Sequence, residues 1–221
     1  MLSSDRPRRA RRAEDKQRRR DQLLDAAAER FAEQPFTALK ISDIAKAAGV
    51  AKGTVFIYFP TKEALFLELL ERQLLDWLEL FDEALEGGRG PWSSARVARL
   101  VADTLDPRTT LTRLLSLLSG VLEQNVEVEQ IAEFKRRLLA RVAVTGALLE
   151  RRLPFLVPGQ GARLMLQINA LVVGVHHTAK PGARAREALS LPDLESLRVD
   201  FSTELRTMLG ALLVGLEHAG A

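Results

Sequence analysis

Apolar side chains recur along most of the chain with the three- and four-residue spacing of amphipathic helices. The first such stripe consists of Leu24, Ala27, Ala28 and Phe31. It predicts a helix over roughly residues 18–33. That helix is expected to end just before Pro35, because proline disfavours the α conformation in the residue that precedes it.

The same kind of pattern continues to the C-terminal end. Further helices are predicted at residues 62–85, 93–105, 109–124, 127–153, 161–178 and 194–218. The pattern predicts that helices end at GGRGP (87–91) and at Pro154, and that residues 180–193 form a loop. We find no internal repeat and no β-hairpin signal, so the expected fold class is all-α.

One stretch, GVAKGTVFIYFP (49–60), is ambiguous. Its β-branched and aromatic residues favour a strand by propensity alone. The spacing of the surrounding residues favours a helix-turn-helix instead: counted from Ile41 as position 1, positions 4, 5, 8, 9, 10, 15 and 18 are Ile44, Ala45, Ala48, Gly49, Val50, Val55 and Tyr58. In that arrangement a small residue at position 5 admits the crossing helix, and the glycine at position 9 takes the left-handed turn conformation.

The motifs LLDAAAERFAEQPF, DIAKAAGVAKGT, YF and KEAL, all within residues 23–70, carry a family resemblance. This segment resembles the DNA-binding domain of TetR-type transcriptional regulators, over almost the whole of that domain. The resemblance implies a basic, disordered arm at 1–17, a DNA-binding domain at 18–78 with its helix-turn-helix at about 41–60, and a helical effector-binding and dimerisation domain at 79–221.

Charge is concentrated at the N-terminus. Residues 1–20 hold nine Arg or Lys against three Asp or Glu, whereas the remaining chain holds 23 against 26. A solvated tail is one interpretation of this arm. The other is that it adds affinity for DNA without adding sequence preference, by releasing counterions from the phosphates.

Composition and motifs exclude several function classes. The chain has no cysteine, and its three histidines form no metal-ligand motif. No Ser-His-Asp arrangement, phosphate-binding glycine loop or paired carboxylates stand out, so we expect neither an enzyme nor a metal or cofactor. No signal-peptide core or membrane-spanning run is present either, which predicts a cytoplasmic protein associated with the nucleoid through DNA.

A helix-turn-helix presents the start of its second helix to the major groove of DNA. The resemblance implies that Lys52, Thr54, Tyr58 and Lys62 lie along the DNA face and mostly hold phosphates. The complete expected surface comprises Arg18, Arg19, Lys40, Ser42, Ala51, Lys52, Gly53, Thr54, Phe56, Ile57, Tyr58 and Lys62. By contrast, Ile44, Ala45, Val50 and Val55 are expected in the core.

The chain departs from the family pattern at several of these positions. The family commonly has Ser or Thr before each helix of the motif, where this sequence has Lys40 and Ala51. It also commonly has Tyr-His where this sequence has Phe56-Ile57, which offer apolar contact to thymine methyls. One of these two is expected to serve the core as well, and specificity is expected to depend partly on Lys40, Ser42 and the basic arm.

The C-terminal part is predicted from the resemblance and from two long apolar helices with small residues. A homodimer is expected through Leu171, Gly174, Leu205, Met208, Leu209 and Leu212. An effector pocket is expected among Trp77, Phe81, Leu114, Leu118, Leu122, Asn125, Phe134, Leu138, Val142, Asn169, His176 and His177. Ordinary core packing is the alternative for both sets.

The function expected from these features is a dimeric repressor of double-stranded, pseudopalindromic operator DNA. A small, apolar or mildly polar effector releases it, through a change transmitted by the helix at 62–85. The alternative is a DNA-binding architectural or division-control protein on the same fold, without a small-molecule effector.

Overall fold

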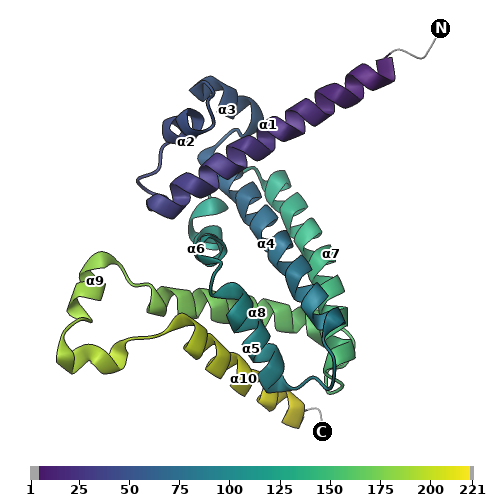
Figure 1. Cartoon of the computed structure of the whole chain (residues 1–221), viewed down its shortest axis with the longest axis vertical. Helices are drawn as coiled ribbons and strands as arrows, with labels where there is room; N and C mark the ends of the chain where they lie inside the picture. The colour runs from purple at the N-terminus through teal and green to yellow at the C-terminus, as the bar shows by residue number, and fades with distance from the viewer. Residues whose placement is uncertain (1–4, 220–221) are drawn as a thin grey trace. The chain divides into compact units, whose positions relative to one another are not determined.

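The computed structural model describes residues 5–219, and every regular element in that range is a helix (Figure 1). The all-α fold class is confirmed. The elements are α1 (Asp5–Glu33), α2 (Ile41–Ala47), α3 (Lys52–Tyr58), α4 (Lys62–Gly87), α5 (Ser94–Leu105), α6 (Thr109–Leu117), η1 (Leu118–Leu122), α7 (Val128–Arg152), α8 (Gln160–Ala179), α9 (Ala183–Ala188), η2 (Pro192–Leu197) and α10 (Phe201–Ala219). None of these helices combines the length and apolar character needed to cross a bilayer.

The helices form two compact units. The N-terminal unit comprises the described residues up to Leu70 together with Val121–Val126, and the C-terminal unit comprises the rest. The boundary therefore lies inside α4, between Leu70 and Glu71, earlier than the expected residue 78. A continuous helix carries no break in its sequence pattern, so the pattern gives no sign of this boundary.

Three phenylalanines form the centre of the N-terminal unit. The ring of Phe66, on α4, meets Phe31 and Phe36 edge to face at centroid distances of 5.4 and 5.1 Å. All three side chains are buried. Since such aromatic pairs add about 0.5–1.5 kcal/mol beyond area burial, they fix α4 against α1 and the turn that follows it.

The first helix is longer than the sequence pattern predicts. It begins at Asp5, so residues 5–17 are helical in place of the expected disordered arm. Five of these thirteen residues are Arg and two are Ala, which have favourable helix propensities, and Asp15 pairs with Arg18 one turn later. Residues 1–4 of the expected arm lie outside the described residues.

The helix-turn-helix is confirmed. Gly49 has φ +65°, the left-handed conformation that position 9 of the motif requires. The N–H of Val50 then donates to the carbonyl of Ala45 at 2.9 Å, which closes the turn between α2 and α3. The ambiguous stretch is therefore helical over Lys52–Tyr58.

In the C-terminal unit, α10 packs against α5 and α8, and α7 packs against α8 (Figure 1). Two ion pairs fasten α7 to the second half of α4: Arg137 with Glu71, and Arg141 with Asp82 at 2.7 Å. The carbonyl of Glu86, at the end of α4, accepts a hydrogen bond from Arg152 at 2.8 Å.

The backbones of α7 and α8 touch where they cross. A Cβ on Gly161 would lie 2.0 Å from the carbonyl oxygen of Gly146, and a Cβ on Gly146 would lie 2.4 Å from the nitrogen of Ala162. By contrast, a Cβ on Gly174 or Gly215 would have no neighbour within 4 Å. Close helix packing within this unit therefore depends on a glycine pair that the sequence pattern did not single out.

Three predicted segments differ from the structure. The helix expected at 109–124 ends at Leu117 and continues as the π-helical turn η1. The loop expected at 180–193 contains α9. The last helix begins at Phe201 rather than 194, because the Asp200 carboxylate accepts a hydrogen bond from the N–H of Thr203 at 2.9 Å and so caps α10.

A histidine is buried near the end of α8. His176 is 8% exposed, and its ring lies edge-on to Phe201 with the centroids 6.5 Å apart. Burial, followed by the nearby His177, Lys180 and Arg113, lowers the pKa of His176 from 6.5 to about 4. The ring is therefore neutral at neutral pH.

The glycine contact predicts a sharp difference between two similar substitutions. Gly161→Ala should lower the free energy of unfolding by roughly 2–4 kcal/mol, because the added methyl group overlaps backbone that cannot move aside. Gly215→Ala, in open space on α10, should change it by less than about 1 kcal/mol and in the stabilising direction. Urea unfolding followed by circular dichroism measures both. Equal stability of the two variants would contradict the contact.

The pKa of His176 predicts acid sensitivity. Because the folded pKa of about 4 lies below the unfolded value of 6.5, the unfolded state binds more protons between these values. The contribution of neutral His176 to the free energy of unfolding is therefore fully present above pH 6.5 and is lost as the pH falls toward 4. At pH 4.5 the loss amounts to about 2 kcal/mol. Between pH 7.0 and pH 4.5 the melting temperature should fall less for His176→Gln than for the parent protein. His218→Gln, which replaces an exposed histidine near the end of α10, is the control and should show the same fall in melting temperature as the parent protein. An equal fall in His176→Gln refutes the assignment.

Candidate nucleic-acid interface

The residues at the N-terminal end of α3 are exposed. Lys52 and Gly53 are exposed and Thr54 is half-buried, whereas Val55 is completely buried. A Cβ on Gly53 would meet no atom within 4 Å, so the backbone at this point is open to a close approach. Ala51 is the N-cap residue and is exposed as well.

Both apolar residues in the middle of α3 face outward. Phe56 is 44% exposed and Ile57 is 76% exposed. The expectation that one of them also serves the core is therefore wrong. Val55 and Phe59, four residues apart and at most 1% exposed, fill that place instead. Tyr58 lies half-buried beside them.

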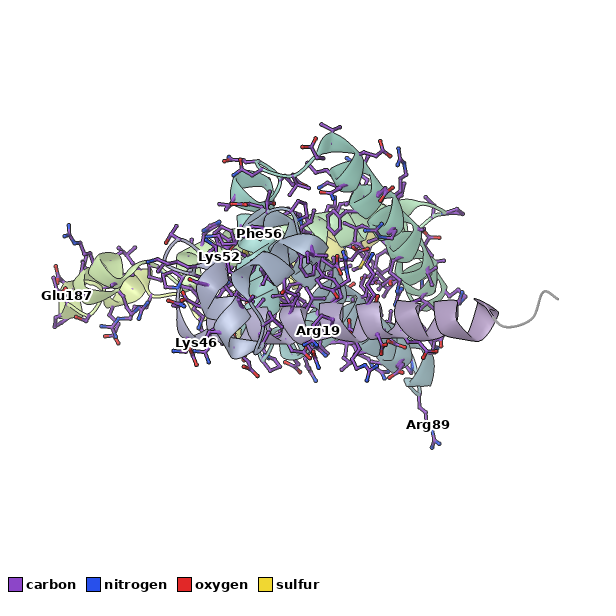
Figure 2. All side chains as sticks on the ribbon, turned by 90° about the horizontal axis from the view of Figure 1, so that it is seen from above. Arg19, Lys46, Lys52, Phe56, Arg89 and Glu187 are labelled. Atoms are coloured by element: carbon purple, nitrogen blue, oxygen red, sulfur yellow. The ribbon has the colours of Figure 1, made fainter. Side chains whose placement is uncertain are left out.

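The first helix of the motif contributes further exposed polar groups. Lys40 and Ser42 are exposed at its start, as expected for the surface. The N–H of Lys40 donates to the Asp43 carboxylate at 3.2 Å, which is the half of a capping box that the residue at the third helical position supplies. Lys46, four residues after Ser42, is also exposed and was not among the expected residues, although helical spacing alone places it on the same face as Ser42. Figure 2 labels Lys46, Lys52 and Phe56 on these two helices.

Lys62 is held inside the unit. Its ammonium group donates to the carbonyl oxygens of Phe36 at 2.9 Å and Leu39 at 3.1 Å, and it lies 3.9 Å from the centroid of the Phe36 ring. These contacts join the start of α4 to the turn between α1 and α2. An ammonium group has three donors, so one remains beyond the two carbonyl contacts.

Arg20 joins three helices of the N-terminal unit. Its guanidinium pairs with both carboxylate oxygens of Glu68 on α4. It donates to the carbonyl of Tyr58 at 3.3 Å, and it lies 4.7 Å from the centroid of the Phe59 ring. The hydrogen bond to Glu68 is the main cause that raises the pKa of Arg20. Arg20 therefore holds the C-terminal end of α3 against α1 and α4.

The two arginines before it lie on the surface of α1. Arg18 and Arg19 are both exposed, and each has a partner on the same helix: Asp15 for Arg18, and Gln22 for Arg19 at 3.0 Å. Exposed pairs of this kind contribute little to stability, so both side chains can exchange these partners for phosphate at small cost. Figure 2 labels Arg19 on this helix.

The residues expected to line an effector pocket fall into two groups. Leu122, buried, and Asn125, exposed, belong to the segment that groups with the N-terminal unit. The others lie in the C-terminal unit, where Trp77 and Phe81 stack at 5.5 Å and Trp77 donates to the Thr104 hydroxyl at 3.1 Å. Trp77, Phe81, Leu114, Phe134, Val142 and His176 are buried, Leu118 and Leu138 are half-buried, and Asn169 and His177 are exposed.

Some of the residues expected at a dimer interface are buried within the chain, and others are accessible at its surface. Leu205 and Leu209 are completely buried within the chain, in the face of α10 that packs on α5 and α8. Leu171, Gly174 and Met208 lie outside that core and together line a groove of about 330 Å³ between α8 and α10. Leu212 is half-buried.

Two protein-family models together match nearly the whole chain. Residues 23–69 match the model described as bacterial regulatory proteins of the tetR family, and residues 71–220 match the tetracyclin repressor-like C-terminal domain. The change from one match to the next coincides with the boundary of the two units inside α4.

Individual relatives agree with these matches. The fatty acid metabolism regulator protein of Bacillus subtilis is 26% identical in an alignment of 184 positions that covers 71% of this chain and 95% of that protein. The transcriptional repressor KstR2 of Rhodococcus jostii is 38% identical over 98 residues, covering 44% of this chain and 40% of that protein.

Solved structures share the fold. The B. subtilis regulator FadR in complex with stearoyl-CoA has a TM-score of 0.56 at 20% identity, over 88% of this chain and 97% of that one. A tetR-family regulator from Streptomyces coelicolor has a TM-score of 0.58 at 23% identity, over 93% and 82%. The helix-turn-helix with its outward-facing second helix, and family matches that extend from residue 23 to residue 220, show that this chain belongs to the TetR family of transcriptional regulators.

Proposed function

We propose that this regulator is a homodimeric repressor that binds a pseudopalindromic operator and is released by a small-molecule effector. The observation that carries the DNA-binding part is the exposed start of α3, where Lys52, Gly53 and Thr54 follow one another on a helix that is fixed from behind. Two copies of this helix would enter successive major grooves, which are roughly 34–36 Å apart along the DNA.

Sequence discrimination in this proposal depends partly on apolar contact. Phe56 and Ile57 offer no hydrogen bonds to base edges, but their exposed side chains fit the methyl groups of thymine. Lys52, Lys46 and Lys40 supply charge for the phosphates, which positions α3 without specifying bases. Operators with thymines beneath the centre of α3 are therefore the ones that this surface favours.

The groove between α8 and α10 supports a dimer. Leu171, Gly174 and Met208 line it, and Met208 is 41% exposed within one chain. A second copy that places the same helices against this groove would cover these apolar side chains and form a four-helix interface. A symmetric dimer also matches an operator with two equal half-sites.

Release by an effector would act through linkage between two binding sites. A ligand that prefers a half-site spacing incompatible with successive grooves lowers operator affinity by that preference, and about 3 kcal/mol reduces the affinity more than a hundredfold. The helix α4 contributes residues to both units, which supports it as the element that transmits the change. A relative that regulates fatty acid metabolism, and a structure solved with stearoyl-CoA, make long-chain acyl-CoA the first effector to test.

Selection of bound sequences from random DNA tests the central proposal. A motif made of two inverted half-sites supports the dimer and provides an operator for ligand screening. Uniform binding to all sequences, with a steep dependence on salt concentration, favours the architectural alternative instead.

Substitutions at the start of α3 test the placement of the DNA surface. With the selected operator, Lys52→Ala should weaken binding roughly tenfold and reduce the salt dependence by about one phosphate contact, and Thr54→Ala should weaken it less. Fluorescence anisotropy over a range of KCl concentrations measures both. Arg99→Ala, which removes an exposed cation from α5, is the matched control and should have no effect. Unchanged affinity of both α3 variants at moderate salt places the surface elsewhere.

The role of Arg20 is tested by changing its partner. If Arg20 positions α3, then Arg20→Met and Glu68→Gln should both destabilise the N-terminal unit, by about 1–3 kcal/mol, and both should weaken operator binding. Arg19→Met should weaken binding without loss of stability, because Arg19 is exposed and donates to Gln22 on its own helix. Thermal unfolding and anisotropy separate these effects. If Glu68→Gln retains full stability and affinity, Arg20 acts on DNA directly and not through α3.

A further inference from the structure

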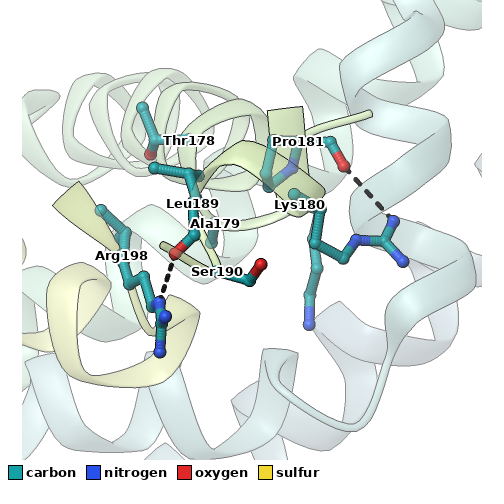
Figure 3. A pocket seen from close by; sticks show the side chains of 9 residues that line it. Thr178, Ala179, Lys180, Pro181, Leu189, Ser190 and Arg198 are labelled. Carbon is teal, nitrogen blue, oxygen red and sulfur yellow. Dashed lines mark hydrogen bonds between the residues drawn. The ribbon is translucent and has the colours of Figure 1, made fainter. Parts of the chain in front are cut away.

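A cavity of about 620 Å³ lies within the C-terminal unit and is lined by none of the residues expected to bind an effector. It is formed where the end of α8, the helix α9 and the segment before α10 come together (Figure 3). Its lining residues are Thr178, Ala179, Lys180, Pro181, Arg186, Leu189, Ser190, Arg198 and Val199. The volume is within the range of pockets that bind small molecules.

The charged residues that line this cavity are all cationic. Lys180, Arg186 and Arg198 come from three successive segments, and the nine lining residues include no Asp or Glu. Two hydroxyl groups, of Thr178 and Ser190, complete the polar lining. The three cations line one hollow without an acidic partner in the lining, and a bound anion would reduce their mutual repulsion.

Backbone contacts hold both guanidinium groups in place. Arg198 donates through Nε to the carbonyl of Leu189 at 2.6 Å, and Arg186 donates through Nη2 to the carbonyl of Pro181 at 3.3 Å (Figure 3). A guanidinium has five N–H donors, so each of these contacts fixes the side chain and leaves further donors for a ligand. Figure 3 draws the ammonium end of Lys180 without any contact among the lining residues.

Acidic groups lie nearby but outside the lining. Glu195 is 3.7 Å from Nη1 of Arg198, and its side chain is 75% exposed. Asp200 has a lowered pKa, first because of its hydrogen bonds with Thr203 and then because of the charges of Lys180 and Arg206. These two carboxylates balance part of the charge from the rim, while the cavity itself stays cationic.

We propose that this cavity binds a small phosphorylated molecule. Guanidinium groups match the geometry of phosphate oxygens and form paired hydrogen bonds with them, and the ammonium group of Lys180 adds a point charge. A ligand with two linked phosphate groups offers acceptor oxygens to more than one of these cations. This site goes beyond the proposed repressor function, since it shares no residue with the DNA surface or with the expected effector pocket.

Inorganic pyrophosphate is the probe for this site. Isothermal titration of the full-length protein, at constant ionic strength in KCl, should show saturable binding of pyrophosphate. The double substitution Lys180→Gln with Arg186→Gln should weaken that binding at least tenfold, and Lys180→Gln alone should weaken it several-fold. Lys180 makes no side-chain hydrogen bond to the lining residues, so its replacement does not disturb the fold of the segment.

Two controls distinguish the cavity from general attraction to a basic protein. Arg184→Gln removes an exposed cation from the same helix as Arg186 but outside the cavity, and Lys52→Ala removes one from the DNA surface. Both should bind pyrophosphate within twofold of the parent protein. Absence of saturable binding overturns the proposal, and so does an equal loss in Arg184→Gln and Lys180→Gln. Because no DNA is present, these outcomes are independent of whether the proposed repressor function is correct.

Discussion

A helix of seven residues with Val, Phe, Ile and Tyr in succession is not stable by itself in water, and α3, the second helix of the helix-turn-helix, is such a helix. Its stability must come from tertiary contacts. Val55 and Phe59 bury one side of α3 in the core, and Arg20 fixes its C-terminal end to α1 and α4. The direction in which Lys52 and its neighbours point is therefore determined by residues behind α3, in the core and on α1 and α4.

The sequence was sufficient to predict this motif but insufficient to predict its supports. Spacing from Ile41 to Tyr58 predicts the two helices because the turn is local, and Gly49 adopts the conformation that the spacing requires. Arg20 and Lys62 resemble any surface cation in the sequence, because their partners Glu68 and Phe36 are 48 and 26 residues away. Contacts over such distances leave no periodic signal.

In the C-terminal unit, too, the sequence pattern predicts the helices but not all of their contacts. Apolar periodicity predicts its long helices, yet it does not distinguish Gly146 and Gly161, whose backbones touch, from glycines in open space. It also fails for α9 and η2, where the described segments bury no side chain and so carry no stripe. The π-helical turn after α6 follows a pattern that a regular helix would satisfy equally well. Only packing between segments distant in sequence distinguishes the touching glycines, and such packing leaves no periodic signal.

The outward position of Phe56 and Ile57 has a thermodynamic consequence. In the free protein these side chains are hydrated, and association with a thymine-rich groove would remove both from water. Burial of apolar surface gives a negative heat-capacity change, so the enthalpy of operator binding would become more favourable as temperature rises. A repressor that reads DNA in part through hydrophobic contact therefore combines a temperature-dependent component with the salt-dependent component common to all phosphate-binding proteins.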